Sequence, residues 1–328
     1  MKKLTPKDIL EIVEANSSFI VTAHVNPDGD SIGSSYGFAY FLKGLGKKVQ
    51  VRMNDDVPGY LSYLVEDSRL DKLEKADVLF VLDVNTPDRV GDIYAELKES
   101  AEKVYVIDHH QEPKQEFDGI YQDVGASSTC EMIWRIAREK REAINGYDEK
   151  LKKLMAQALL NGIYTDSGFF SYPRTDQELF SFAGELTGLG ADPMAISKNV
   201  NQTKKKSTLK LLGLALSKTE YLEGDKLAIV ALDEKDFSEA GASREDKEGL
   251  VNYGLSIESV EISAFLYKTE SDHEPRVSLR SKDIAVDGLA RSFGGGGHMH
   301  AAASKFPGQS FAEAKSNLIK ALVELVNG

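Results

Sequence analysis

Four short apolar runs constrain the fold of this chain more than any other feature of its sequence. Residues 18–24 (SFIVTAH), 47–53, 76–84 and 102–110 are rich in β-branched residues and have the length of buried strands. Segments with the spacing of apolar residues typical of helices alternate with them, as in residues 34–46. Strands that alternate with helices predict an α/β fold with a mostly parallel sheet and flanking helices.

The pattern changes after Gly190, which predicts a second domain. Residues 191–215 have the pattern of a helical linker, and strand-like runs such as residues 227–232 follow them. We therefore expect a larger α/β domain at residues 1–190 and a smaller α/β domain at residues 216–328.

Charge and composition exclude some partners. The formal net charge of −12 argues against a general binder of duplex DNA, which usually carries a basic surface. No apolar run approaches the ~20 residues that span a bilayer, so no membrane partner is expected. The single cysteine, Cys130, has no partner for an internal disulfide, which favours a cytoplasmic location.

Potential metal ligands stand where three of the predicted strands end, and Asp166 follows a predicted helix. In a parallel sheet the carboxyl ends of the strands meet at one edge, and ligands bind there. Each of these residues alone has an ordinary explanation in a turn or a helix cap. Together they predict one polar site, formed by His24, Asp28, Asp30, Asp83, Asp108, His109, His110 and Asp166.

The ligand types indicate which cofactor such a site would hold. Two imidazoles and four carboxylates suit Mn²⁺, with Mg²⁺, Co²⁺ or Fe²⁺ as alternatives, better than a thiolate zinc site. Six ligands suit two ions that share a carboxylate. Two ions ~3.5–4 Å apart stabilise displacement at phosphorus, so the pattern favours phosphoester hydrolysis.

Six motifs stand out along the chain, namely HVNPDGDSIGS (24–34), VLDV (81–84), IDHH (107–110), GIYTDSG (162–168), SLRS (278–281) and SFGGGGHMHAAA (292–303). Together they resemble the DHH phosphoesterases and the DHHA1 domain that accompanies them in the oligoribonuclease and pAp phosphatase branch. One departure is Ala303, where the family usually has glycine.

The resemblance implies roles for the residues of the first domain. It implies a ligand set for two Mn²⁺ ions: His24 and Asp28 on one, Asp30, His109 and Asp166 on the other, and Asp83 on both. Asp108 would orient an imidazole by accepting its second N–H. His110 would face the substrate and stabilise the transition state or assist the leaving group.

For the second domain the resemblance implies a substrate clamp across a cleft. Arg280 would bind a phosphate, since its planar guanidinium matches phosphate oxygens. Gly295, Gly296, Gly297 and His298 would lie beside the scissile nucleotide, because glycine lets backbone N–H groups approach an anion. Taken alone, such a glycine run is more typical of a flexible loop.

Two further segments are candidates for substrate contact. Ser127, Ser128 and Thr129 could bind a phosphate at the start of a helix, although helix capping is the more common role of such residues. Arg174, in the stretch Tyr172-Pro173-Arg174-Thr175, is a weaker candidate.

We therefore expect a cytoplasmic, Mn²⁺-dependent phosphodiesterase and phosphatase. Its substrates would be short oligoribonucleotides, cut to mononucleotides in either the 3′–5′ or the 5′–3′ direction, and the 3′-phosphate of pAp. A homodimer is compatible with the sequence. The main alternative is a hydrolase of pApA or cyclic dinucleotides such as c-di-AMP. A pyrophosphatase, a RecJ-type exonuclease of long strands and a non-catalytic nucleotide-binding regulator are less favoured.

Overall fold

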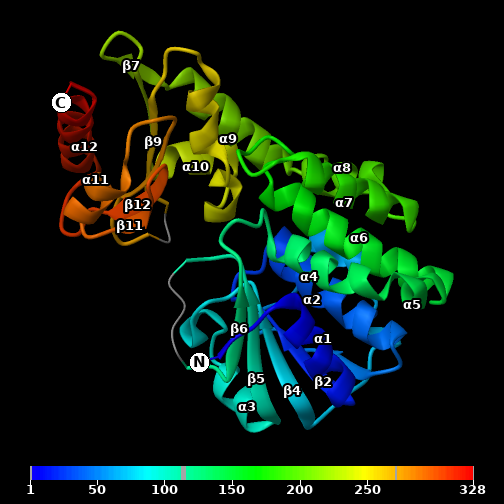
Figure 1. Cartoon of the computed structure of the whole chain (residues 1–328). Helices are drawn as coiled ribbons and strands as arrows, with labels where there is room; N and C mark the ends of the chain where they lie inside the picture. Colours follow the sequence, from blue (N-terminus) through cyan, green and yellow to red (C-terminus); the bar gives the residue numbers. More distant parts are fainter. Residues whose placement is uncertain (1, 112–115, 270–271, 328) are drawn as a thin grey trace. The chain divides into compact units, whose positions relative to one another are not determined.

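The computed structural model of the chain describes residues 2–111, 116–269 and 272–327 (Figure 1). It divides into two compact units, Met1–Thr203 and Lys204–Gly328. The segment expected as a linker contains α8 (Pro193–Asn201), which is part of the first unit, and the greater part of α9 (Lys206–Ser217), which belongs to the second.

The first unit is built on a six-stranded parallel sheet with strand order β1-β6-β5-β4-β2-β3, visible at the bottom of Figure 1. Its strands are β1 (Lys2–Lys3), β2 (Ser18–Thr22), β3 (Lys48–Val51), β4 (Ala76–Leu82), β5 (Ala101–Asp108) and β6 (Gly119–Gln122). The predicted α/β fold is confirmed. The sequence did not predict β1 and β6, because strands of two and four residues are too short to show an apolar period.

Helices cover both faces of this sheet. They are α1 (Pro6–Ala15), α2 (Gly29–Gly44), α3 (Tyr94–Glu99), α4 (Thr129–Ala137), α5 (Arg141–Asn145), α6 (Glu149–Asp166) and α7 (Gln177–Gly188). Successive strand residues point to opposite faces. Phe19 and Val21 of β2 therefore join the core under α1, α2, α4 and α6, whereas Ile20 joins a second core that includes Leu97 of α3.

The helices α2 and α6 pack unusually close, because glycines line their contact. A Cβ atom at Gly33 would lie 2.5 Å from the Ala158 carbonyl oxygen, and one at Gly37 would lie 2.5 Å from Leu159 Cδ2. The helix expected from the apolar pattern of residues 34–46 is α2, which begins earlier, at Gly29. Its N-cap is Asp28, whose carboxylate accepts hydrogen bonds from the N–H groups of Asp30 and Ser31.

The second unit contains a mixed six-stranded sheet with strand order β11-β12-β10-β9-β8-β7. Its strands are β7 (Glu220–Leu222), β8 (Leu227–Leu232), β9 (Ile262–Tyr267), β10 (Arg276–Ser281), β11 (Gly296–His298) and β12 (Ala301–Lys305). Its helices after α9 are α10 (Glu234–Ala240), α11 (Asp287–Ser292) and α12 (Phe311–Asn327). Leu318 and Leu322 of α12 pack with Leu266 and Leu279 in its main core.

Short 3₁₀ helices complete the two units. They span Gly59–Leu64, Asp67–Arg69, Pro87–Arg89, Arg138–Lys140, Arg244–Lys247 and Leu250–Ser256. Within the described residues, no helix has the length and apolar character needed to cross a membrane.

The glycine run of the second unit lies partly in a strand: Gly296 and Gly297 belong to it, whereas Gly294 and Gly295 precede it. Gly296–His298 is β11, paired antiparallel with β12. A Cβ atom at Gly297 would lie 2.5 Å from the Ala301 carbonyl oxygen, and one at Gly295 would lie 2.1 Å from that of Ala303. The alternative of a flexible loop is therefore wrong for Gly296 and Gly297. Gly295 and Gly297 leave no room for a side chain beside β12, which allows the backbones to approach closely.

Candidate metal centre

The candidate centre lies where the strand order of the first unit reverses direction. From β2 the chain goes to β3 on one side and then to β4 on the other, so the carboxyl ends of β2 and β4 flank a topological switch point. Such a point is a general ligand-binding position in open parallel sheets. His24 follows β2, Asp83 follows β4 directly, and Asp108 is the last residue of β5.

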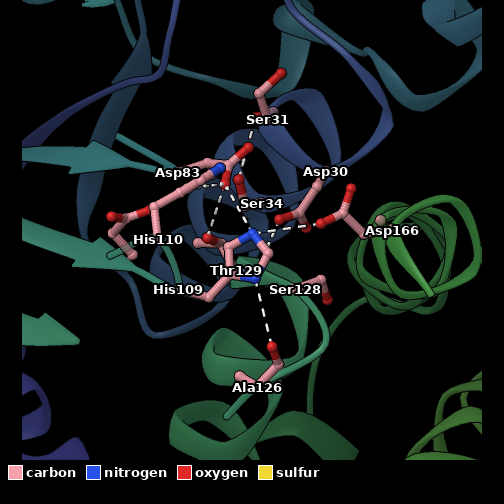
Figure 2. A network of polar contacts seen from close by, with 12 residues as sticks. Asp30, Ser31, Ser34, Asp83, His109, His110, Ala126, Ser128, Thr129 and Asp166 are labelled. Carbon is pink, nitrogen blue, oxygen red and sulfur yellow. Dashed lines mark hydrogen bonds and ion pairs between the residues drawn. The ribbon is translucent and has the colours of Figure 1, made fainter. Parts of the chain in front are cut away.

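The structure brings the expected ligands together in three overlapping groups. In each group, one potential ligand atom per residue lies within 4.8 Å of the others. The groups are His24, Asp28 and Asp83; Asp30, His109 and Asp166; and Asp83, His109 and His110. Their members come from loops after the strands and from the helices α2 and α6 (Figure 2).

Both central imidazoles turn the same ring nitrogen toward the carboxylates. Nδ1 of His24 lies 2.8 Å from the Val25 carbonyl oxygen, and Nδ1 of His109 lies 3.4 Å from that of Ala126. The Nε2 atoms face inward, 3.3 Å from Asp83 Oδ2 for His24 and 3.3 Å from Asp166 Oδ2 for His109. A metal-binding histidine usually has this arrangement, with its other N–H donated to a carbonyl or carboxylate.

Asp83 lies between the two histidines. Its two oxygens face different rings, with Oδ2 toward His24 and Oδ1 3.5 Å from His109 Nε2. Its backbone has φ +58°, in the left-handed region that is costly for residues other than glycine. The hydroxyl of Thr129 also donates to Oδ1 at 3.2 Å. Asp83 is thus held by several contacts in a position from which it could contact two ions.

The carboxylate of Asp30 is fixed by the start of α4. It is fully buried and accepts hydrogen bonds from the N–H groups of Thr129 at 2.7 Å and Cys130 at 2.9 Å. Ser128 caps the same helix by accepting from Glu131 N–H. The two N–H groups that could have bound a phosphate are therefore used by Asp30, and a helix N-terminus favours such a negative charge.

Gly162 of α6 makes room for this carboxylate. A Cβ atom at residue 162 would lie 2.6 Å from Asp30 Oδ1 and 2.2 Å from Cys130 Sγ. The roles of Gly162 and of the two backbone N–H groups were not predicted, because neither is a chemically distinctive side chain.

Asp108 orients His110. Its Oδ1 lies 2.7 Å from His110 Nδ1, so the carboxylate accepts the Nδ1 proton and leaves Nε2 free of this contact. Asp108 is fully buried, whereas the His110 side chain is 28% exposed. This arrangement suits the roles that the resemblance implies, with His110 accessible to a substrate and Asp108 behind it.

Crowding of charges shifts the pKa values of the centre. Burial, together with repulsion from Asp30 and Asp83, raises the pKa of Asp166 to about 9. Burial and the nearby Asp83 raise the pKa of Asp30 to about 7. Burial alone would lower the pKa of His109, but its hydrogen bond to Asp83 and the surrounding carboxylates raise it to about 10. The pKa of His24 rises to about 9 against the effect of burial, because Asp83 and Asp28 are close.

The shifts have a common cause, which is an excess of negative charge in a small buried volume. Four carboxylates face two imidazoles, and protons are retained because the carboxylates repel one another. Divalent cations would offset the same charge and replace those protons. The nitrogen and oxygen donors, the orientation of the histidines and the excess negative charge therefore fit a metal centre.

Two of the residues expected to bind substrate in the second unit, Arg280 and His298, lie in one row across its sheet. Strand pairing places His298 of β11 opposite Ala301 of β12, and Ala301 opposite Arg280 of β10. Directly paired residues lie on the same face of a sheet, so the small Ala301 separates His298 from Arg280. Arg280 donates a hydrogen bond to the Leu279 carbonyl oxygen at 2.9 Å.

Comparison with known proteins gives matches to both units. The N-terminal domain of the DHH family matches residues 18–163, and the DHHA1 domain matches residues 224–328. The chain is 29% identical over 325 residues to the bifunctional oligoribonuclease and PAP phosphatase NrnA of Thermus thermophilus, covering 97% of this chain and 92% of that protein.

Two further similarities extend over nearly the whole chain. It is 30% identical over 333 residues to the cyclic-di-AMP phosphodiesterase PdeA of Listeria monocytogenes, covering 95% of this chain but only 48% of PdeA. The crystal structure of an exopolyphosphatase-related protein from Bacteroides fragilis has a TM-score of 0.86 and 27% identity, covering 97% of this chain and 95% of that one. The first unit therefore contains the N-terminal domain of the DHH family, and the second unit contains a DHHA1 domain.

Proposed function

We propose that this protein is a metal-dependent phosphoesterase that cuts short oligoribonucleotides to mononucleotides and converts pAp to AMP. One observation carries the proposal. The group of His24, Asp28 and Asp83 adjoins the group of Asp30, His109 and Asp166 through the contact between Asp83 and His109, in a buried, strongly acidic centre. The similarity to NrnA, which is named for both activities and aligns over nearly the full length of each chain, supports these substrates.

In this proposal the centre holds two Mn²⁺ ions. His24 and Asp28 would hold the first ion, Asp30, His109 and Asp166 would hold the second, and Asp83 would be a ligand available to both. Such ions, when bound, activate water and stabilise the charge that develops at phosphorus. The donor set of imidazoles and carboxylates supports Mn²⁺ over a thiolate-type zinc site.

The protein's own groups orient the ligands and the substrate. Thr129 and Cys130 hold Asp30 through their N–H groups, while the Val25 and Ala126 carbonyls set the ring orientations of His24 and His109. Because Asp108 keeps the Nδ1 proton of His110, the Nε2 atom of His110 is the one that would act at the leaving group.

The substrate contacts proposed for the DHHA1 domain are Arg280, Gly295, Gly296, Gly297 and His298. The row of Arg280, Ala301 and His298 supports the first and the last of these contacts, since it sets a guanidinium and an imidazole on one face of the sheet. We also propose that the protein acts in the cytoplasm, in keeping with its one free, buried cysteine.

A second candidate function is hydrolysis of c-di-AMP or pApA, which the similarity to PdeA supports. A parallel assay with Mn²⁺ separates the two candidates. It would compare pAp, pApA, c-di-AMP and labelled RNAs of two to five and of twenty nucleotides. We expect turnover of pAp and the shortest RNAs and much slower turnover of the twenty-nucleotide RNA. Exclusive turnover of c-di-AMP would favour the second candidate, and no turnover of any phosphoester would refute both.

A further inference from the structure

Arg174 stands out among the arginines of the first unit. Most of the others are in ion pairs with carboxylates, namely Arg52, Arg69, Arg135, Arg138 and Arg141. Arg174 is exposed and, within residues 2–111, 116–269 and 272–327, forms no ion pair. In a chain with 52 acidic residues, a guanidinium without a carboxylate partner is available to a ligand.

The position of Arg174 relative to the candidate centre is fixed by a shared acceptor. Its Nη1 donates to the Ala126 carbonyl oxygen at 2.8 Å, and the Nδ1 atom of His109 faces the same oxygen at 3.4 Å. Figure 2 shows Ala126 below the His109 ring, away from Asp30 and Asp166. Arg174 therefore lies next to the centre, but on the side of His109 opposite to its inward-facing Nε2.

This position determines which part of a substrate Arg174 can contact. A phosphate undergoing hydrolysis must lie on the Nε2 side of His109, among the carboxylates that face the proposed ions. The guanidinium has five N–H donors, of which one is used by Ala126, so several remain for an anion.

We propose that Arg174 is a specificity-determining residue that binds a second phosphate of the substrate, one that is not hydrolysed. This inference rests on the proposed phosphoesterase function and makes it more specific. Arg174 would favour substrates with at least two phosphate groups, such as pAp or short RNA, over simple phosphomonoesters.

The test compares two substrates that share the same reacting group. Adenosine 3′-phosphate and pAp both carry a 3′-phosphate, but only pAp has the 5′-phosphate. Losing a charge-assisted hydrogen bond typically costs about 1.5–3 kcal/mol, so Arg174→Ala should raise the KM for pAp roughly 10- to 100-fold. The KM for adenosine 3′-phosphate and the affinity for Mn²⁺ should be unchanged, and Arg174→Lys should recover part of the loss.

Arg141→Ala is the matched control, because Arg141 is also an accessible arginine of this unit but faces Glu185 on α7. It should leave both substrates unaffected. An equal loss of kcat on both substrates, or weaker Mn²⁺ binding in Arg174→Ala, would show that Arg174 only positions His109 and would overturn the proposal. An unchanged KM for pAp in Arg174→Ala would also overturn the proposal.

The same comparison can be made without turnover. If the wild-type protein hydrolyses neither nucleotide, the proposed function fails, but calorimetric binding of the two nucleotides still tests Arg174. A selective loss of pAp binding in Arg174→Ala would support the inference in that case, and equal binding by variant and wild type would refute it.

Discussion

Replacing Gly162 by alanine should damage the metal centre without changing any ligand. The added Cβ would lie 2.2 Å from Cys130 Sγ and 2.6 Å from Asp30 Oδ1, both far inside contact distance. The surrounding atoms belong to α2, α4 and α6, which are packed in one core, so they have little room to move. We expect the Asp30 carboxylate to be displaced from the N–H groups of Thr129 and Cys130.

The size of the effect follows from these contacts. Glycine to alanine inside a helix should by itself stabilise the fold by roughly 0.5–1 kcal/mol. Overpacking a core costs about 1–3 kcal/mol, so the net result should be a loss of roughly 0–2.5 kcal/mol in the free energy of unfolding. Misplacing a metal ligand through its supporting contacts should weaken Mn²⁺ binding by about 10- to 100-fold.

Two measurements and two further variants test this reasoning. Urea unfolding gives the free energy of unfolding, and calorimetric titration gives the Mn²⁺ affinity. Gly184→Ala is the control, because Gly184 lies within α7 with nothing near its Cβ position, and it should be neutral or stabilising. Adding Cys130→Ala to Gly162→Ala removes the sulfur contact but not the Asp30 contact, so stability should recover more than metal affinity. Wild-type stability and affinity in Gly162→Ala would refute the argument.

Two other predictions concern charge in the centre. Asp83→Ala, or treatment with EDTA, should abolish hydrolysis of pAp, and activity that survives both would contradict a two-metal site. Raising the pH from about 6.5 to 9 should strengthen Mn²⁺ binding, because the ion competes with protons for the same groups. These groups have raised pKa values, which are about 7 for Asp30, about 9 for Asp166 and His24, and about 10 for His109. Calorimetry in buffers of different ionisation enthalpy should detect proton release, and an affinity independent of pH would argue against metal binding by these residues.

The positions of the candidate ligands could be predicted from sequence because they follow strands with a strong apolar pattern. His24 and Asp83 end such runs, and parallel strands bring their carboxyl ends to one edge. The contacts that hold the ligands could not be predicted in the same way. The N–H group of Thr129 donates a hydrogen bond to Asp30 only because α4 packs against α2, although the two residues are 99 positions apart in the sequence.

The glycine run shows a second limit of sequence reasoning. Glycine is common in mobile loops and also where two backbones approach closely, and composition does not distinguish these cases. In β11 the deciding factor is the neighbouring strand, since Gly297 pairs with Ala302 and leaves no space for a side chain.

The close packing of α2 against α6 has a consequence for the choice of cation. The two helices run antiparallel, so that Gly29 meets Thr165 near one end and Gly37 meets Leu159 further along. Asp30 lies in the first turn of α2 and Asp166 is the last residue of α6, so the interhelical distance sets the separation between two carboxylates proposed for the same ion. Gly37 lies roughly 10 Å along the helix from Asp30, given a rise of 1.5 Å per residue. A larger residue there would spread the helices and enlarge the space between these ligands, so preference among cations of different radius can be changed by a substitution in the apolar core.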